Sequence, residues 1–186
     1  MTARRLNAIA LREPVCAIKR FLTRPSRPMC RYLILASLAA LVPACILYIF
    51  AAVVASSFQI SRVSDALPQR DGSLLDFAGV VVLAPVVETV LLAWMIFALR
   101  KIFSDDLKVA IISGLIWGGL HASVSVMWFF GPAWNFFIFS CCYMAWRKIS
   151  LGHAFLAAAV PHMLVNTYAL LMHFGIQQLS RALDSG

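Results

Sequence analysis

The sequence predicts an all-α protein, a polytopic membrane helical bundle with about five transmembrane helices. Of its 186 residues, 62% are apolar and only 13% are charged, and the mean hydropathy is +0.85. Soluble domains average about 45–50% apolar and about 25% charged residues, so the composition excludes a soluble domain, and it excludes a disordered chain as well. Backbone polar groups cannot stay unpaired in lipid, which makes the membrane segments helices.

Charged residues divide the chain into apolar segments, each long enough for the roughly 20 residues that cross a bilayer as a helix. These segments are residues 32–61, 77–99, 109–146 and 149–180. The third has 38 residues, which is enough for two helices. We expect Gly131-Pro132 to form the turn between them, because proline and glycine interrupt helices. The total is therefore five spans.

Basic residues gather in a few segments of the chain. Eight of the 16 Lys and Arg residues lie at or before Arg31, and others lie at 100–108 and 147–148. Five helices place these segments on one side, which the positive-inside rule makes cytoplasmic, with the C-terminus outside. We expect residues 1–30 to form a basic cytoplasmic arm on anionic lipid, residues 31–180 the transmembrane domain, and residues 181–186 a short tail. Nucleic acid is not an expected partner, because no reading motif accompanies the basic residues.

Four polar residues interrupt the predicted spans at similar depth. At 1.5 Å per residue, Glu88 lies roughly 18 Å from Arg100, His121 roughly 20 Å from Lys108, and His162 roughly 21 Å from Lys148. Asn166 follows one turn after His162, on the same helix face. A lone polar residue in a span often serves only to bridge helices. Convergence of an acid, two imidazoles and a carboxamide favours a functional site.

These residue types suit water-mediated hydrolysis of an amide bond. A carboxylate and an imidazole that share a water can deprotonate it for attack on a carbonyl. A second imidazole and a carboxamide can donate hydrogen bonds to the oxyanion that forms. The alternative is a zinc site on Glu88, His121 and His162, because one carboxylate and two imidazoles are a common zinc set with one open position.

Three segments resemble the motifs of a known family. Pro85-Val-Val-Glu88-Thr resembles its first motif, a proline followed by Glu-Glu-x-x-x-Arg; Trp117-Gly-Gly-Leu-His121 resembles its aromatic-x-x-x-His motif, and His162-Met-Leu-Val-Asn166 its His-x-x-x-Asn motif. The family is the CAAX-protease and bacteriocin-processing (Abi) family of intramembrane proteases.

The resemblance covers residues 74–170 and implies a glutamate-based peptidase without a cofactor. Glu88 and His121 would activate the water, and His162 with Asn166 would form the oxyanion hole. It also implies a substrate with a membrane-proximal peptide or protein tail, and we expect the protein in the bacterial inner membrane.

The sequence departs from the family pattern at two positions. Thr89 stands where the family has its second Glu, and Ala93 stands where it has Arg. Because these two side chains would pair with each other, their joint loss leaves no orphan charge. The departure supports a hypothesis from another class, a catalytically silent membrane scaffold or immunity protein.

The remaining noteworthy residues have structural interpretations. His153 is half a turn out of phase with the third motif, and we expect it to anchor the helix at the cytoplasmic interface. His173 shares the motif's face but lies about 16 Å further out. Gly114, Gly118 and Gly119 offer a small-residue face for close helix contact. The five cysteines show no paired spacing, so neither disulfides nor a thiolate zinc site is expected.

Overall fold

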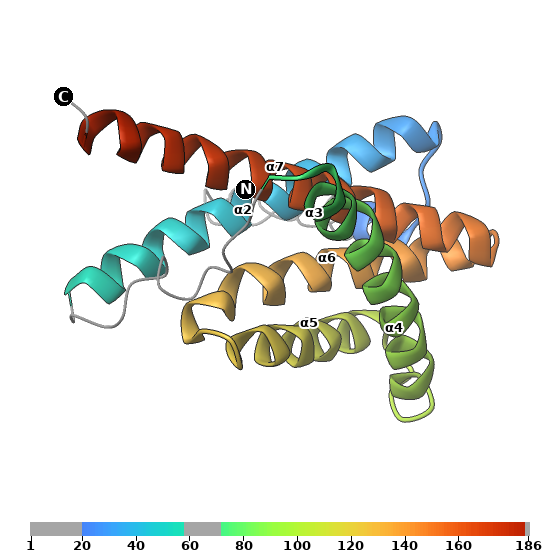
Figure 1. Ribbon diagram of the computed structural model, residues 1–186. Coiled ribbons are helices and arrows are strands. Elements are labelled where there is room, and N and C mark those ends of the chain that lie inside the picture. The colour runs from blue at the N-terminus through green and yellow to red at the C-terminus, as the bar shows by residue number, and fades with distance from the viewer. Residues whose placement is uncertain (1–19, 58–71, 185–186) are drawn as a thin grey trace, which may run out of the picture.

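The computed structural model describes residues 20–57 and 72–184, and these residues form helices with no strand among them (Figure 1). The long helices are α2 (Met29–Ser57), α4 (Ala84–Leu99), α5 (Asp106–Ala122), α6 (Phe130–Arg147) and α7 (Leu151–Asp184). A short helix α3 (Leu74–Ala78) and a π turn η2 (Gly79–Leu83) lead into α4, and a 3-10 turn η3 (Val126–Trp128) leads into α6. The predicted all-α bundle is confirmed.

Four helical segments in the described part of the chain are long and apolar enough to cross a membrane. They are Met29–Val54, Leu74–Leu99, Val126–Arg147 and Leu151–Gly175. The remaining long helix, α5, has 17 residues and a length of about 25 Å. It is therefore shorter than the roughly 30 Å hydrocarbon layer. The protein is a polytopic membrane protein. Its described residues form five long helices, of which all but α5 belong to segments long enough to span a membrane.

The turn expected at Gly131-Pro132 lies elsewhere. Helix α5 ends at Ala122, the chain turns through residues 123–129, and Gly131 and Pro132 fall in the first turn of α6. Proline fits there because the first-turn N–H groups have no partner within the helix. The Ser123 hydroxyl donates a hydrogen bond of 2.6 Å to the Leu120 carbonyl and closes the end of α5.

One predicted domain boundary differs from the structure, and part of another predicted region lies outside the described residues. Helix α7 continues to Asp184, so it runs through the boundary expected at residue 180. Residues 1–19 of the expected basic arm, and residues 62–71 of the loop after the first span, lie outside the described residues.

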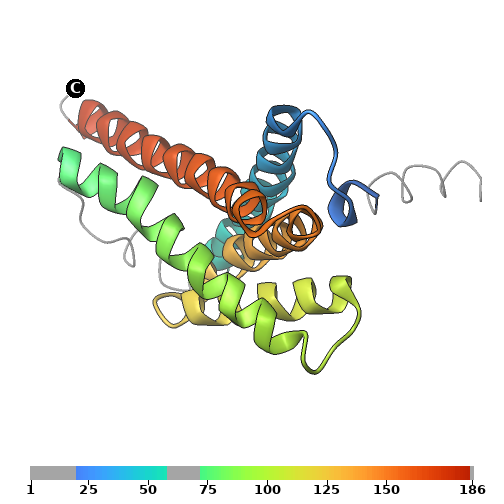
Figure 2. The same ribbon diagram turned by 90° about the vertical axis from the view of Figure 1, so that its right-hand side faces the viewer.

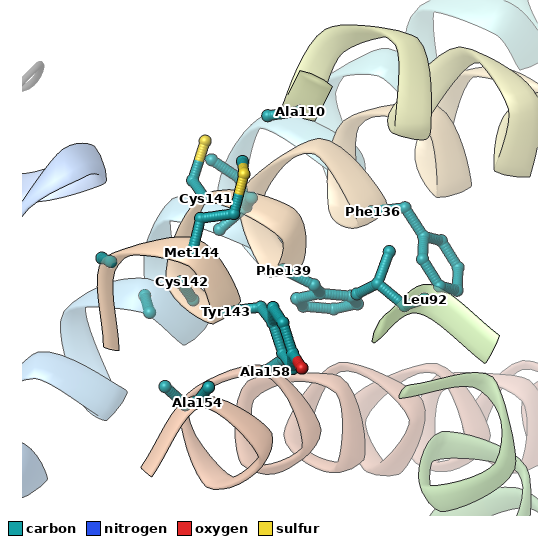
Figure 3. Packing of buried hydrophobic residues seen from close by; sticks show 14 of the residues in the cluster. Leu92, Ala110, Phe136, Phe139, Cys141, Cys142, Tyr143, Met144, Ala154 and Ala158 are labelled. Carbon is teal, nitrogen blue, oxygen red and sulfur yellow. The ribbon is translucent and has the colours of Figure 1, made fainter. Parts of the chain in front are cut away.

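Helix α6 is the central element of the bundle. It contacts α2, α5 and α7, and Figure 1 shows it between α5 and α7. From Phe136 to Trp146 its residues are buried with the exception of Phe137, which is half-buried. Figure 3 shows Leu92 of α4 beside Phe136 and Phe139, and Ala154 and Ala158 of α7 facing the same helix. The outward faces of α2, α4 and α7 carry exposed aliphatic and aromatic side chains that suit lipid contact.

Proline 43 shapes the contact between α2 and α6. It lies inside α2 and has no N–H to donate to the carbonyl of Ala39, four residues earlier. The indole N–H of Trp134, from α6, donates a hydrogen bond of 2.8 Å to that carbonyl. A side chain from one helix thereby satisfies the backbone group that proline leaves unpaired in the other.

Polar contacts join the segments that precede α2, α5 and α7 at one end of the bundle. The Asp106 carboxylate forms an ion pair with Arg100 and lies 3.6 Å from the Lys148 ammonium. Lys148 also donates a hydrogen bond of 3.0 Å to the Thr23 carbonyl. The described part of the first basic segment, at Thr23, therefore meets the basic segments at 100–108 and 147–148 at the same end. The C-terminus of α7 lies at the opposite end (Figures 1 and 2).

Glycines bring α5 into close contact with α6. A Cβ atom at Gly114 would lie 2.5 Å from the Ala133 carbonyl oxygen, and one at Gly118 would lie 2.7 Å from the Ala133 Cβ. Next to them the buried hydroxyls of Ser113 and Ser140 are 2.7 Å apart and share a hydrogen bond. The expected small-residue face is confirmed for Gly114 and Gly118. Gly119 does not belong to it, because no atom lies within 4 Å of a Cβ built there.

Gly118→Ala is expected to destabilise the bundle by about 1–3 kcal/mol, because the added methyl group overpacks the interface. Gly119→Ala is the matched control, since it makes the same chemical change one residue away in open space. It should be neutral or stabilising, because alanine favours helix by up to ~1 kcal/mol. Thermal unfolding of the purified variants in detergent measures both effects. Equal midpoints would contradict the close contact at Gly118.

Candidate functional site

Glu88 and His162 make direct contact within the membrane-spanning part of the bundle. Oε2 of Glu88, in the second turn of α4, lies 3.5 Å from Nε2 of His162 in α7. The His162 side chain is 6% exposed and the Glu88 side chain 26%. A carboxyl group in a lipid-embedded segment requires a partner, and His162 is that partner here. About a quarter of the Glu88 side chain stays exposed beside this contact.

Aromatic rings of α6 hold the His162 imidazole in place. The ring of Phe139 stacks on it with centroids 4.8 Å apart, and Phe136 meets it edge-on at 5.2 Å. Both phenylalanines are almost fully buried. A ring clamped on two sides has little rotational freedom, so the nitrogen that faces Glu88 is fixed by packing as well as by the carboxyl group.

His121 lies close to this pair and contacts the same aromatic ring. It occupies the last turn of α5, because that helix ends at Ala122 rather than continuing toward the turn expected at Gly131-Pro132. Its imidazole centroid is 5.7 Å from that of Phe136, the ring that also meets His162. Phe136 thus contacts both imidazoles.

A backbone contact determines the tautomer of His121. Its Nδ1 lies 2.9 Å from the carbonyl oxygen of Trp117, one turn earlier. A carbonyl oxygen only accepts hydrogen bonds, so Nδ1 carries the hydrogen and Nε2 of the neutral ring keeps a lone pair. The Trp117 ring stacks on Phe136 with centroids 4.2 Å apart. His121 therefore presents a hydrogen-bond acceptor from a ring that is held on one side.

Asn166 reaches the segment that carries Glu88. Its side-chain nitrogen donates a hydrogen bond of 2.9 Å to the carbonyl of Val80, in the π turn η2 that precedes α4. It lies one turn after His162 on α7, and α7 packs against both η2 and α4. A carboxamide nitrogen has two hydrogens, so the contact with Val80 leaves one for another acceptor.

The four residues expected at one depth are thus distributed over a contact pair and two neighbours. Glu88 and His162 are in direct contact. His121 contacts Phe136, which also contacts His162, and Asn166 bonds the Val80 carbonyl in the turn before α4. Within the described residues, no group of three His, Cys, Asp or Glu side chains is arranged to hold a metal ion. The zinc set Glu88, His121 and His162 would need His121 to approach the other two.

Sequence reasoning missed the aromatic residues of α6 and the Val80 carbonyl. Phe136 and Phe139 lie in a segment rich in aromatic residues. The sequence there does not distinguish a ring that holds a histidine from a ring that packs only against apolar neighbours. Pro85 gave only a partial signal, because in an α-helix it frees the carbonyl of Val81, four residues earlier, and the π turn makes Val80 the free carbonyl instead.

The other histidines lie away from this group. His153 is exposed near the start of α7, where its Nδ1 is 2.7 Å from the Ser150 hydroxyl and its ring stacks parallel to that of Trp146. His173 lies further along α7, with Nε2 2.9 Å from the Gln177 amide nitrogen. The contacts of both histidines are with residues other than Glu88 and His162, and the exposed position of His153 agrees with the expectation from its helix phase.

Comparisons of the chain with protein-family models, with curated proteins and with solved structures find no match. The resemblance to the Abi family therefore rests on the three motifs.

The position of Thr89 sets a limit on restoring the family motif. Thr89 is 1% exposed and faces the interior of the bundle, next to Leu92 on the buried face of α4. A glutamate there would have no arginine at position 93 to pair with. It would place a second acid in an apolar environment.

Thr89→Glu is accordingly expected to destabilise the protein, at a cost of at least about 2.5–3.5 kcal/mol for an acid within a span. Thr89→Val is the control, since it keeps the shape of the side chain and adds no charge. Unfolding midpoints in detergent and yields of inserted protein measure the effect. If Thr89→Glu proved as stable as Thr89→Val, a glutamate at position 89 would not be buried without a partner, and this interpretation would be wrong.

Proposed function

We propose that this protein is an intramembrane peptidase of the CAAX-protease-like, glutamate-dependent type. The observation that carries the proposal is the contact between Glu88 and His162 inside the membrane-spanning bundle, with Glu88 partly open. An acid is costly at this depth, and its retention beside an imidazole favours a chemical role. The substrate class is a peptide or protein with a membrane-proximal tail.

In the proposed mechanism Glu88 and His121 activate a water molecule. The carboxylate takes a proton from water while the oxygen attacks the scissile carbonyl carbon, and His121 accepts a hydrogen bond from that water through Nε2. The free N–H of Asn166 and the His162 imidazole stabilise the oxyanion of the tetrahedral intermediate. Glu88 then returns the proton to the leaving nitrogen as the C–N bond breaks, which gives a carboxylate and an amine.

We further propose that the protein resides in the bacterial inner membrane with its N-terminus in the cytoplasm. The basic segments meet at one end of the bundle around Asp106, and the positive-inside rule assigns that end to the cytoplasm. Tags at residues 1 and 186 should then be cleaved by added protease from opposite sides of sealed vesicles. Cleavage of both tags from one side would overturn the orientation.

Glu88→Gln is expected to abolish cleavage, because the amide keeps the size of the side chain and cannot accept the proton. The test compares host membranes that carry wild type or Glu88→Gln at matched levels, with all protein termini mapped by mass spectrometry. New termini that occur only with the wild type would identify both the activity and the substrate. Identical termini in both samples would remove the support for a peptidase.

His153→Ala is the matched control for this experiment. It removes an imidazole from the same helix as His162, at an exposed position away from Glu88. Cleavage should persist in this variant and disappear in His121→Ala and His162→Ala. Equal loss in His153→Ala and His121→Ala would contradict the assignment of the site.

Two alternatives remain as outcomes of measurement. A zinc-dependent form of the same peptidase would contain stoichiometric zinc after purification and lose activity with a chelator. A silent scaffold or immunity protein is favoured by Thr89 and Ala93 in place of the family Glu and Arg. Its phenotype in the host would survive Glu88→Gln.

A further inference from the structure

The π turn that precedes α4 leaves one backbone carbonyl without a donor from its own helix. The Ala84 N–H donates to the Gly79 carbonyl, five residues earlier, instead of to Val80, four residues earlier. In the same register the donor for Val80 would be the N–H of residue 85. That residue is a proline and has none. The Val80 carbonyl is therefore available for a partner outside the segment.

Asn166 of α7 supplies that partner. Its side-chain nitrogen lies 2.9 Å from the Val80 oxygen, and the carboxamide is oriented by this contact, since a carbonyl accepts from nitrogen and repels oxygen. A buried carbonyl with no donor is costly in a protein interior and more so in a bilayer. The bond between Asn166 and Val80 thus has a stabilising role that the chemistry of a peptidase does not explain.

The same two segments meet a second time at Glu88. His162 and Asn166 are four residues apart on one face of α7, and they contact Glu88 and Val80 respectively. The Val80 contact lies before Pro85 and the Glu88 contact after it. Two attachment points of this kind fix both the position of α4 along α7 and its rotation.

We propose that Asn166 is a positioning residue for Glu88, acting through the carbonyl that Pro85 leaves free at Val80. Its bond to Val80 holds the start of α4 against α7, so that the Glu88 carboxyl group stays against the His162 imidazole. A catalytic role for this positioning rests on the proposed function. The structural coupling between Asn166 and Pro85 is independent of the proposed function.

Pro85→Ala provides the test of that coupling. Alanine has an N–H, which can donate to the Val80 carbonyl in the register of the π turn, and the Asn166 bond becomes redundant. In the wild-type background Asn166→Ala should reduce the ratio of folded to unfolded protein about three- to ten-fold. In the Pro85→Ala background the same substitution should have little effect. An equal loss in both backgrounds would overturn the proposal.

Thr167→Ala is the control for this cycle. Thr167 is the next residue of α7, and its hydroxyl bonds the Met163 carbonyl of its own helix. Its effect on unfolding should be the same with proline or alanine at position 85. A Thr167→Ala effect that also vanished in the Pro85→Ala background would mean that Pro85→Ala perturbs α7 generally, which would also overturn the specific coupling.

A second measurement follows Glu88 itself and needs neither Pro85→Ala nor peptidase activity. A hydrophobic carbodiimide modifies carboxyl groups within membranes, and mass spectrometry gives the rate at Glu88. Loss of contact with His162 uncovers one side of the carboxyl group. Asn166→Ala should therefore increase the rate several-fold, as His162→Ala does, and Thr167→Ala should leave it unchanged. A merely stabilising bond would leave the Asn166→Ala rate at the wild-type value, which would overturn positioning.

The two proposals fail in distinguishable ways. If Glu88→Gln abolishes cleavage while the labelling rate in Asn166→Ala equals that of the wild type, the protein is a peptidase and Asn166 does not position Glu88. If Asn166→Ala changes the labelling rate while Glu88→Gln leaves all termini unchanged, Asn166 positions Glu88 in a protein that is not a peptidase.

Discussion

The absence of water from the bilayer core governs this structure, because each backbone polar group there must find its partner within the protein. Prolines make the constraint visible. Pro43 frees the carbonyl of Ala39, which accepts from Trp134 of α6, and Pro85 frees that of Val80, which accepts from Asn166 of α7. In both cases the unpaired group becomes the attachment point for another helix. Proline in these spans therefore specifies helix contacts instead of only interrupting helices.

The same constraint sorts the polar side chains of the bundle. Ser113 and Ser140 bond each other in the interior, and His121 bonds the carbonyl of its own preceding turn. The two serine hydroxyls satisfy each other, whereas His121 uses only Nδ1 in its contact. Glu88 differs, because its contact with His162 covers one side while about a quarter of the side chain stays exposed. The reactive capacity of the site is concentrated on this carboxyl group and on the free Nε2 of His121.

The helical bundle follows from composition and charge spacing alone, since apolar runs between charged residues leave little freedom in a bilayer. The contact of Glu88 with His162 could be expected from equal depth on two helices. The depth of His121 counted from Lys108 needs a helix only over residues 108–121, and α5 supplies it. The sequence did not show that this helix ends one residue later, at Ala122. Glycine and proline at 131–132 gave a misleading signal, because a proline is tolerated in the first turn of a helix.

The packing contacts of α6 could not be predicted from the sequence, for a different reason. Phe136 contacts Trp117, His121 and His162, yet it lies among apolar neighbours that sequence cannot rank. Contacts of this kind depend on how three helices meet, and helix crossing follows from the shapes of all three surfaces. The close contact at Gly114 and Gly118 could be predicted from the sequence. Glycines four residues apart lie on one face of a helix, where their lack of a side chain lets another helix approach closely.

Thr89 and Ala93 stand where the motif that this segment resembles has an acidic and a basic residue. Positions 89 and 93 are one turn apart on α4, so a Glu and an Arg there would pair along the helix. Thr89 is buried and Ala93 packs partly buried against the hydrophobic core, and small side chains let α4 approach that core closely. Among the described residues, the acid of this segment then has one ionisable contact, His162. The Glu88 carboxyl group is therefore held by a single imidazole, which Phe136 and Phe139 clamp. The geometry of that clamp, together with the anchor of Asn166 on Val80, then decides where the carboxyl group lies.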